Sequence, residues 1–251
     1  SIVSALNVTA TTFSAASLSQ TAGTGTTTFN GALNFNTAAG LVVNAANITV
    51  NNTVTTTASG VVTLNPGTLL TIAAAGDMSL DGAFSQGGAG TVSTAGDITT
   101  TNDAIGFTNA VTLSGAVALN TGAGVGNISF GSTLDGTQNL TLTAGTGSIT
   151  FTGVVGATRL GIVSIVSALN VTATTFSAAS LSQTAGTGAT TFNGALDFNT
   201  AAGLVVNAAN IMVNSTVTTT VNGVVTLNPG TLLTIAAAGD MSIDGAFSQG
   251  G

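Results

Sequence analysis

Phenylalanine recurs along this chain with a short and nearly regular period. Six of the eleven phenylalanines stand in similar surroundings, such as IGFTN, ISFGS and ITFTG. They are Phe84, Phe107, Phe130, Phe151, Phe176 and Phe198. They follow one another at intervals of roughly 20–25 residues, a period typical of a solenoid, in which each repeat forms one coil that stacks on the coil before it. We therefore expect these side chains to be buried and stacked as one column on successive coils.

A second and much longer repeat is superimposed on this period. Residues 1–88 match residues 164–251, and the two copies differ at only seven positions. The differing pairs are Thr26/Ala189, Asn34/Asp197, Thr49/Met212, Asn52/Ser215, Ala58/Val221, Ser59/Asn222 and Leu80/Ile243. We predict one continuous solenoid over residues 1–251, with a first long repeat at 1–163 and the first part of a second at 164–251.

The local pattern between the phenylalanines predicts strands and turns only. Apolar and polar residues alternate in short segments, as in LTLTAGTGSITFTG at residues 140–153, and alternation with a period of two is typical of a β-strand. Gly, Asn, Asp and Ser separate these segments, and no apolar pattern is long enough for a helix. Seven steps lead from Phe84 to its equivalent Phe247 when Leu227 stands for a missing phenylalanine. We therefore predict an all-β fold, a parallel β-helix (β-solenoid) with about seven coils of roughly 20–25 residues per 163-residue repeat.

An antiparallel sandwich of immunoglobulin-like modules is the competing fold. Such modules carry a turn signal every ~8 to 12 residues and span ~100 residues each. A 163-residue repeat with seven internal steps does not divide in that way, and the chain has no Trp or Tyr for a core of that kind. The solenoid is therefore the favoured prediction.

The composition excludes most catalytic chemistry. The chain has no His and no Cys, so it offers no imidazole base, no thiolate nucleophile and no ligand set for zinc, haem or an iron–sulfur cluster. Its one basic residue, Arg159, stands against eight aspartates, so a nucleic-acid backbone finds nothing to bind. No apolar run approaches the ~20 residues that a membrane-spanning helix needs. We expect no enzyme, no catalytic residue, no nucleic-acid partner and no membrane insertion.

Aspartate is the only candidate metal ligand. Asp77 and Asp97 share the context A-G-D followed by an apolar residue, about one coil length apart, and Asp81 lies close to Asp77 in the sequence. If these turns stack on adjacent coils, their carboxylates could bind calcium, which prefers oxygen ligands. The simpler interpretation is that Asp caps turns by accepting hydrogen bonds from backbone N–H groups. We therefore predict no cofactor and no metal site, and keep Asp77, Asp81 and Asp97 as weak calcium candidates.

The stretch Gly126–Gly156, GNISFGSTLDGTQNLTLTAGTGSITFTGVVG, resembles the repeat regions of filamentous-haemagglutinin-like adhesins and related giant β-strand-repeat exoproteins of bacterial surfaces. The resemblance extends over the whole chain and lies in Thr-, Gly- and Asn-rich alternating strands with few charges. It implies a right-handed β-helical shaft, export across a Gram-negative envelope and an extracellular or cell-surface location. It also implies a role in adhesion, in a biofilm matrix, or in a surface filament or sheath.

The sequence favours a structural function over two alternatives. We expect the structural repeat region of a secreted bacterial surface protein that forms a rod, an extracellular filament or a sheath with an adhesive or matrix role. Rows of outward threonines, as in residues 53–57, also fit a ligand-binding solenoid for ice or polysaccharide. A polysaccharide-cleaving β-helix is least favoured, because the close pairs Asp77/Asp81 and Asp240/Asp244 lie far from Arg159 in the sequence.

The sequence also predicts self-association. The segments SIVSALNV and GAFSQGG at the two ends contain no charged residue and no proline that would block an open strand edge. One cation and eight aspartates over 251 residues provide little long-range repulsion between rods. We expect association end to end and laterally. A host surface, an abiotic surface or a polysaccharide is a further partner that fits this interpretation.

Overall fold

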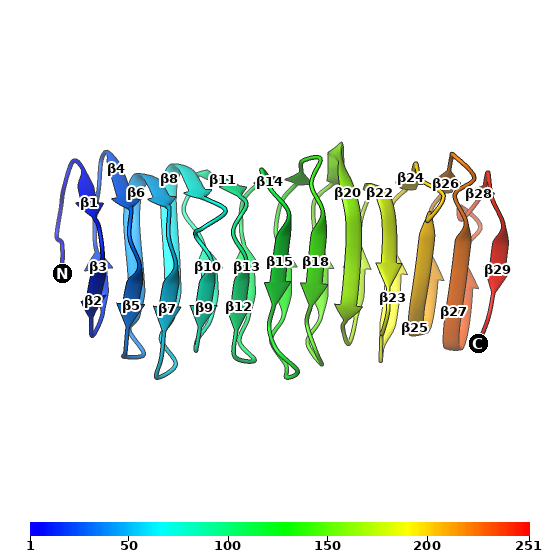
Figure 1. Cartoon of the computed structure of the whole chain (residues 1–251). Helices are drawn as coiled ribbons and strands as arrows, with labels where there is room; N and C mark the ends of the chain where they lie inside the picture. The colour runs from blue at the N-terminus through cyan, green and yellow to red at the C-terminus, as the bar shows by residue number, and fades with distance from the viewer.

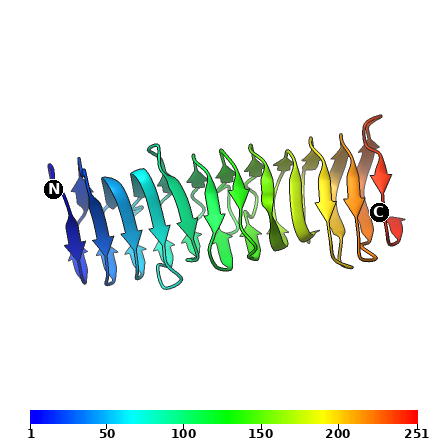
Figure 2. The same cartoon turned by 90° about the horizontal axis from the view of Figure 1, so that it is seen from above.

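The computed structural model describes residues 1–251 as one elongated β-solenoid of about 12 turns (Figures 1 and 2), with the two termini at opposite ends of the rod. It contains 29 strands in a single sheet and no helix, and the strands of successive turns pair in parallel. No part of the chain forms an apolar helix that could cross a membrane. The predicted fold class, a parallel β-solenoid, is confirmed.

Each turn passes through three strand positions, and each position pairs with the same position of the next turn, so the rod has three sheet faces. Face 1 contains β3 (Leu18–Gln20), β10 (Phe84–Gln86), β13 (Ile105–Phe107), β16 (Ile128–Phe130), β19 (Ile149–Phe151), β21 (Val171–Ala173) and β23 (Ala189–Phe192). Face 2 contains β1 (Val8–Ala10), β4 (Thr26–Phe29), β11 (Thr91–Thr94), β14 (Val111–Leu113), β17 (Leu134–Asp135), β24 (Leu196–Phe198), β26 (Val217–Thr219) and β28 (Met241–Ser242).

Face 3 contains β2 (Phe13–Ala15), β5 (Leu33–Phe35), β7 (Val54–Thr56), β9 (Met78–Leu80), β12 (Ile98–Thr100), β15 (Val117–Asn120), β18 (Leu140–Thr143) and β29 (Phe247–Gln249). Six longer strands run around a corner and so belong to two faces. They are β6 (Leu41–Val50) and β8 (Val62–Ile72) from face 1 to face 2, β20 (Val155–Ser167) and β22 (Phe176–Gln183) from face 2 to face 3, and β25 (Leu204–Val213) and β27 (Val225–Ile235) from face 3 to face 1.

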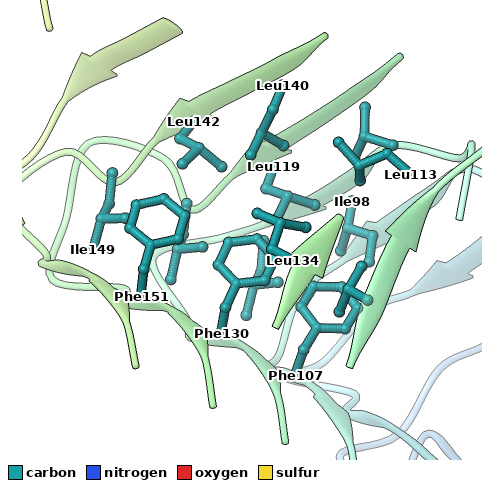
Figure 3. Close-up of a cluster of buried hydrophobic side chains, with 14 of the residues drawn as sticks. Ile98, Phe107, Leu113, Leu119, Phe130, Leu134, Leu140, Leu142, Ile149 and Phe151 are labelled. Carbon is teal, nitrogen blue, oxygen red and sulfur yellow. The ribbon is translucent and has the colours of Figure 1, made fainter. Parts of the chain in front are cut away.

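The alternation of apolar and polar residues places one set of side chains in the interior of the rod. In β16, Ile128 and Phe130 point inward and are almost fully buried, whereas Ser129 points outward. The parallel register stacks identical side chains on successive turns, since Ile128 pairs with Ile105 on one neighbouring turn and with Ile149 on the other. The 54 buried apolar residues form one continuous cluster along the rod, part of which is drawn in Figure 3. Burial of this cluster is the main force that holds the turns together.

The predicted phenylalanine column is confirmed. All six side chains are at most 2% exposed, and the ring centroids of neighbours lie between 5.3 and 6.4 Å apart. Phe107, Phe130 and Phe151 stack in a single row on face 1, and Figure 3 shows these three rings side by side. Their rings are nearly parallel, with interplanar angles of 7° and 2°.

The prediction of about seven coils per long repeat is too low, because the phenylalanine column changes face. Phe151 pairs with Ala173, one full turn later, but the next member of the column is Phe176, at the start of face 2. The step between these two rings is therefore one turn plus a third of a turn. Phe247, which closes the predicted seven steps, lies on face 3.

The 163-residue repeat consequently contains seven and two-thirds turns. Strand β1 on face 2 recurs as β21 on face 1, and β2 on face 3 recurs at the start of β22 on face 2. Strand β3 on face 1 recurs at the end of β22 on face 3. Because the chain winds from face 1 to face 2 to face 3, every segment of residues 1–88 recurs in the second copy one face earlier in this order. Strand β20 spans the boundary between residues 163 and 164 without interruption.

Candidate functional surface

A row of hydroxyl groups runs along face 2 over six successive turns. The outward residues that pair in register are Thr9, Thr28, Thr49, Thr71, Ser93 and Thr112. The row ends at Asp135 on the following turn. The neighbouring row of outward residues, two positions earlier in each strand, consists of Thr26, Asn47, Leu69 and Thr91. This row is not made of hydroxyl groups alone, so the hydroxyl array is only one residue wide.

The threonine run at residues 53–57 does not form an outward array. Thr55 points outward, but Thr56 points inward, is 3% exposed, and its hydroxyl donates to the carbonyl of Gly60 at 2.6 Å. Consecutive threonines in a strand necessarily face opposite sides.

The row of hydroxyl groups on face 2 was not detectable from the sequence, because the turns differ in length. Ile165 pairs with Gln183 on the next turn, whereas Val54 pairs with the more distant Met78.

The aspartates and asparagines of the turns cap the backbone of the next turn. Asp77 Oδ1 accepts from the N–H of Asp97 at 2.9 Å, and Asp97 Oδ1 accepts from the N–H of Ala118 at 2.7 Å. Asp135 makes the same contact with the N–H of Thr158, and Asn127 with that of Ser148. These bonds link adjacent turns, so the side chains contribute to the stacking of the coils.

Of the three calcium candidates, the structure brings two together. Asp77 and Asp97 precede β9 and β12 on adjacent turns, as their shared context indicated, and a shallow open depression lies beside them. Asp81 lies beyond the opposite end of β9, where its carboxylate accepts from the N–H of Ser59 at 2.7 Å. No group of three or more His, Cys, Asp or Glu side chains comes together anywhere in the chain.

An asparagine ladder lies at a corner of the rod in each copy of the repeat, between faces 1 and 2 in the first copy and between faces 3 and 1 in the second. Asn65 Nδ2 donates to Asn44 Oδ1 at 2.9 Å, and Asn44 Nδ2 donates to the carbonyl of Gln20 at 2.8 Å. Asn228 and Asn207 repeat these contacts in the second copy. A shallow depression with a floor of Ala and Gly lies beside each ladder. The amide groups are largely occupied by bonds between turns.

Arg159 links three successive turns across the boundary between the two long repeats. Its guanidinium donates to the carbonyls of Ala178 and Asp197, at 3.1 and 2.7 Å, and forms the only ion pair of the chain with the Asp197 carboxylate. Asp197 is the one position among the seven differences where the charge changes, because the first copy has Asn34. The only cation of the chain therefore lies beside the one aspartate that distinguishes the two copies.

We expect Arg159→Met to lower the free energy of unfolding by about 1–2 kcal/mol, since hydrogen bonds from a charged donor to two carbonyls are lost along with the ion pair. Asp197→Asn restores the residue of the first copy and removes only a half-exposed ion pair, so its cost should stay below about 1 kcal/mol. Urea denaturation followed by circular dichroism measures both values. Equal costs for the two variants would show that the carbonyl bonds contribute nothing.

No protein-family model, curated protein or solved structure matches this chain. The structure supports a repeat-rich β-helix protein with tandem repeats, which is the coarser part of the resemblance drawn from the sequence. The finer assignment to haemagglutinin-like adhesins is therefore a matter for proposal.

Proposed function

We propose that this chain is the structural repeat region of a secreted bacterial surface protein, in which stacked coils form a rod, an extracellular filament or a sheath with an adhesive or matrix role. The observation that carries the proposal is the continuity of the coil stack across the boundary of the long repeats. Strand β20 runs through residues 163 and 164, and its neighbours on both sides keep their pairing. Further repeats can therefore extend the rod without a joint.

The use of the polar side chains supports a structural role over a catalytic one. Arg159 and the turn aspartates Asp77 and Asp97 hold neighbouring turns together through backbone groups. Such bonds stiffen a rod, whereas a hydrolytic site would need carboxylates grouped around a substrate. The outward Thr, Ser and Asn side chains keep the surface polar with very little charge, so rods in a filament or matrix repel one another only weakly.

A ligand-binding solenoid is the second candidate, and the hydroxyl row on face 2 is the observation that favours it. An ordered lattice of ice or polysaccharide would be matched best by two or more regular rows. The neighbouring row is interrupted by Asn47 and Leu69, so the match extends in one dimension only. We therefore rank this function below the structural one.

Small-angle X-ray scattering of the chain should give a rod about 58 Å long, because about 12 turns each rise ~4.8 Å. A longer protein, in which residues 89–163 are appended after residue 251, completes the second long repeat and adds about three and one-third turns. Its rod should be longer by ~16 Å at an unchanged cross-section. A compact particle, or extra mass that widens the rod instead of lengthening it, would contradict the proposed function.

A further inference from the structure

Asparagine is followed directly by glycine at three places in the chain, and each of these pairs lies in a turn between two strands. The pairs are Asn30–Gly31, Asn193–Gly194 and Asn222–Gly223. An asparagine in this context can react with its own backbone, because glycine has no Cβ atom that keeps its nitrogen away from the side-chain carbon Cγ of the asparagine. The surroundings of the three pairs within the rod are not the same.

Asn193 lies at the corner between β23 and β24 with its side chain exposed. Its Oδ1 accepts a hydrogen bond from Asn214 Nδ2, on the next turn, at 3.0 Å. The following residue, Gly194, is partly exposed, and its N–H forms no hydrogen bond within the chain. Attack of the Gly194 nitrogen on Cγ of Asn193 places negative charge on Oδ1, where Asn214 already provides a donor that stabilises this charge.

The first copy of the repeat contains the same arrangement. Asn51 Nδ2 donates to Asn30 Oδ1 at 2.9 Å, and the N–H of Gly31 also forms no hydrogen bond. This corner lies between faces 2 and 3, whereas that of Asn193 lies between faces 1 and 2. The contacts therefore follow from the repeated sequence and the turn stacked on it, whichever face carries them.

The third pair, Asn222–Gly223, lacks both features. The N–H of Gly223 donates to the carbonyl of Thr220 at 3.0 Å, and Gly223 is buried. No group donates to Oδ1 of Asn222, whose backbone is held in a left-handed conformation with a φ of +57°. The same dipeptide thus occurs in the same rod with its reactive nitrogen occupied, which makes Asn222 an internal reference.

We propose that Asn193 and Asn30 are sites of spontaneous deamidation, each assisted by the asparagine of the next turn. Hydroxide takes the proton of the Gly194 N–H, and the nitrogen forms a bond to Cγ of Asn193. The bond from Cγ to Nδ2 breaks, and ammonia leaves with a proton from water. Water then opens the resulting succinimide ring at either of its two carbonyls, which gives aspartate or isoaspartate. One water is consumed and one ammonia is released, with no oxidant or cofactor.

The two products affect the rod differently. Aspartate adds a negative charge at the corner and still accepts from Asn214. Isoaspartate inserts a methylene group into the main chain, between the hydrogen bond from the N–H of residue 193 to the carbonyl of Ala173 and the backbone of Gly194. That backbone packs so closely on Thr175 of the preceding turn that a Cβ atom would collide with it. Isoaspartate therefore displaces this corner and weakens the stacking of the turns there.

The test compares the three sites within one molecule. The folded chain is incubated in mildly alkaline buffer, digested with protease and analysed by mass spectrometry, and a protein isoaspartate methyltransferase detects the isoaspartate product. Asn30 and Asn193 should convert at least about tenfold faster than Asn222. In concentrated urea the three sites should convert at similar rates, because only their local sequence then matters. Equal rates in the folded chain, or a difference that persists in urea, overturn the proposal.

Two variants separate the role of the neighbouring asparagine, and each is the control for the other. Asn214→Ala removes the donor to Asn193, and Asn51→Ala removes the donor to Asn30. Each variant should slow conversion at its own site about threefold or more and leave the other site unchanged. If Asn193 reacts as fast in Asn214→Ala as in the unmodified chain, or if both sites change together, assistance by the next turn is overturned.

Discussion

Phe130→Ala should lower the free energy of unfolding by ~3–5 kcal/mol, because it removes the central ring of the phenylalanine column and leaves a cavity. The ring of Phe130 is 1% exposed, and its centroid lies 5.5 Å from that of Phe107 and 5.3 Å from that of Phe151. The loss includes two aromatic contacts as well as the burial of the ring. Equilibrium denaturation in guanidinium chloride measures the difference.

Ser129→Ala is the matched control for this experiment. Ser129 is the neighbour of Phe130 in β16, points outward and takes no part in the core. Its replacement should change stability by less than about 0.5 kcal/mol. If both substitutions had similar small effects, the column would not be a stabilising element of the rod.

Gly40→Ala should cost about 3 kcal/mol or more, for two reasons that add. Gly40 has a φ of +50°, a left-handed conformation that costs about 1–2 kcal/mol for a residue with a Cβ atom. A Cβ at this position would also collide with the carbonyl oxygen of Val61 on the next turn, and overpacking against a backbone costs a further ~1–3 kcal/mol. Gly203, the equivalent in the second copy, has a φ of +53° and meets Val224 in the same way.

The control is Gly67→Ala, since a Cβ on Gly67 meets no atom closer than 3.5 Å. Thermal and urea denaturation should show a large loss for Gly40→Ala and a change of less than about 1 kcal/mol for Gly67→Ala. The double variant Gly40→Ala, Gly203→Ala should lose about twice as much as either single variant, because the two sites are far apart. A neutral Gly40→Ala would mean that the turns do not approach as closely as described.

The fold class and the interior of the rod were predictable because both depend on local periodicity. Alternation of apolar and polar residues fixes which side of a strand is buried, and the phenylalanine spacing marks one side chain per coil. The number of turns was not predictable from the same signal, because the step from Phe151 to Phe176 includes a passage to another face. Whether such a step is one turn or one turn and a third depends on the positions of the corners. These positions cannot be read from the sequence, because the turns have unequal lengths.

The candidate surface was predictable only where neighbouring turns share a sequence motif. The A-G-D context correctly placed Asp77 beside Asp97, but it gave no information on Asp81, which lies beyond the other end of a strand. The partner of Arg159 is 38 residues away in the sequence and two turns away in the rod. Contacts that skip a turn leave no periodic trace, so only the three-dimensional register reveals them.

The long repeat contains seven whole turns and two-thirds of another. This fraction has a consequence for how arrays of such repeats lengthen by gene duplication. Strand β6 bends from face 1 to face 2, and its copy β25 bends from face 3 to face 1 with the same burial pattern. The same amino-acid sequence therefore folds in the same way on different faces of the rod. A duplicated stretch of gene need not encode whole turns to be accepted; any length that starts and ends at matching corners folds onto the existing stack. Each further repeat shifts a given residue to another of the three faces. If a residue is substituted before the repeat is duplicated, three consecutive repeats then carry the new side chain on all three faces of the rod.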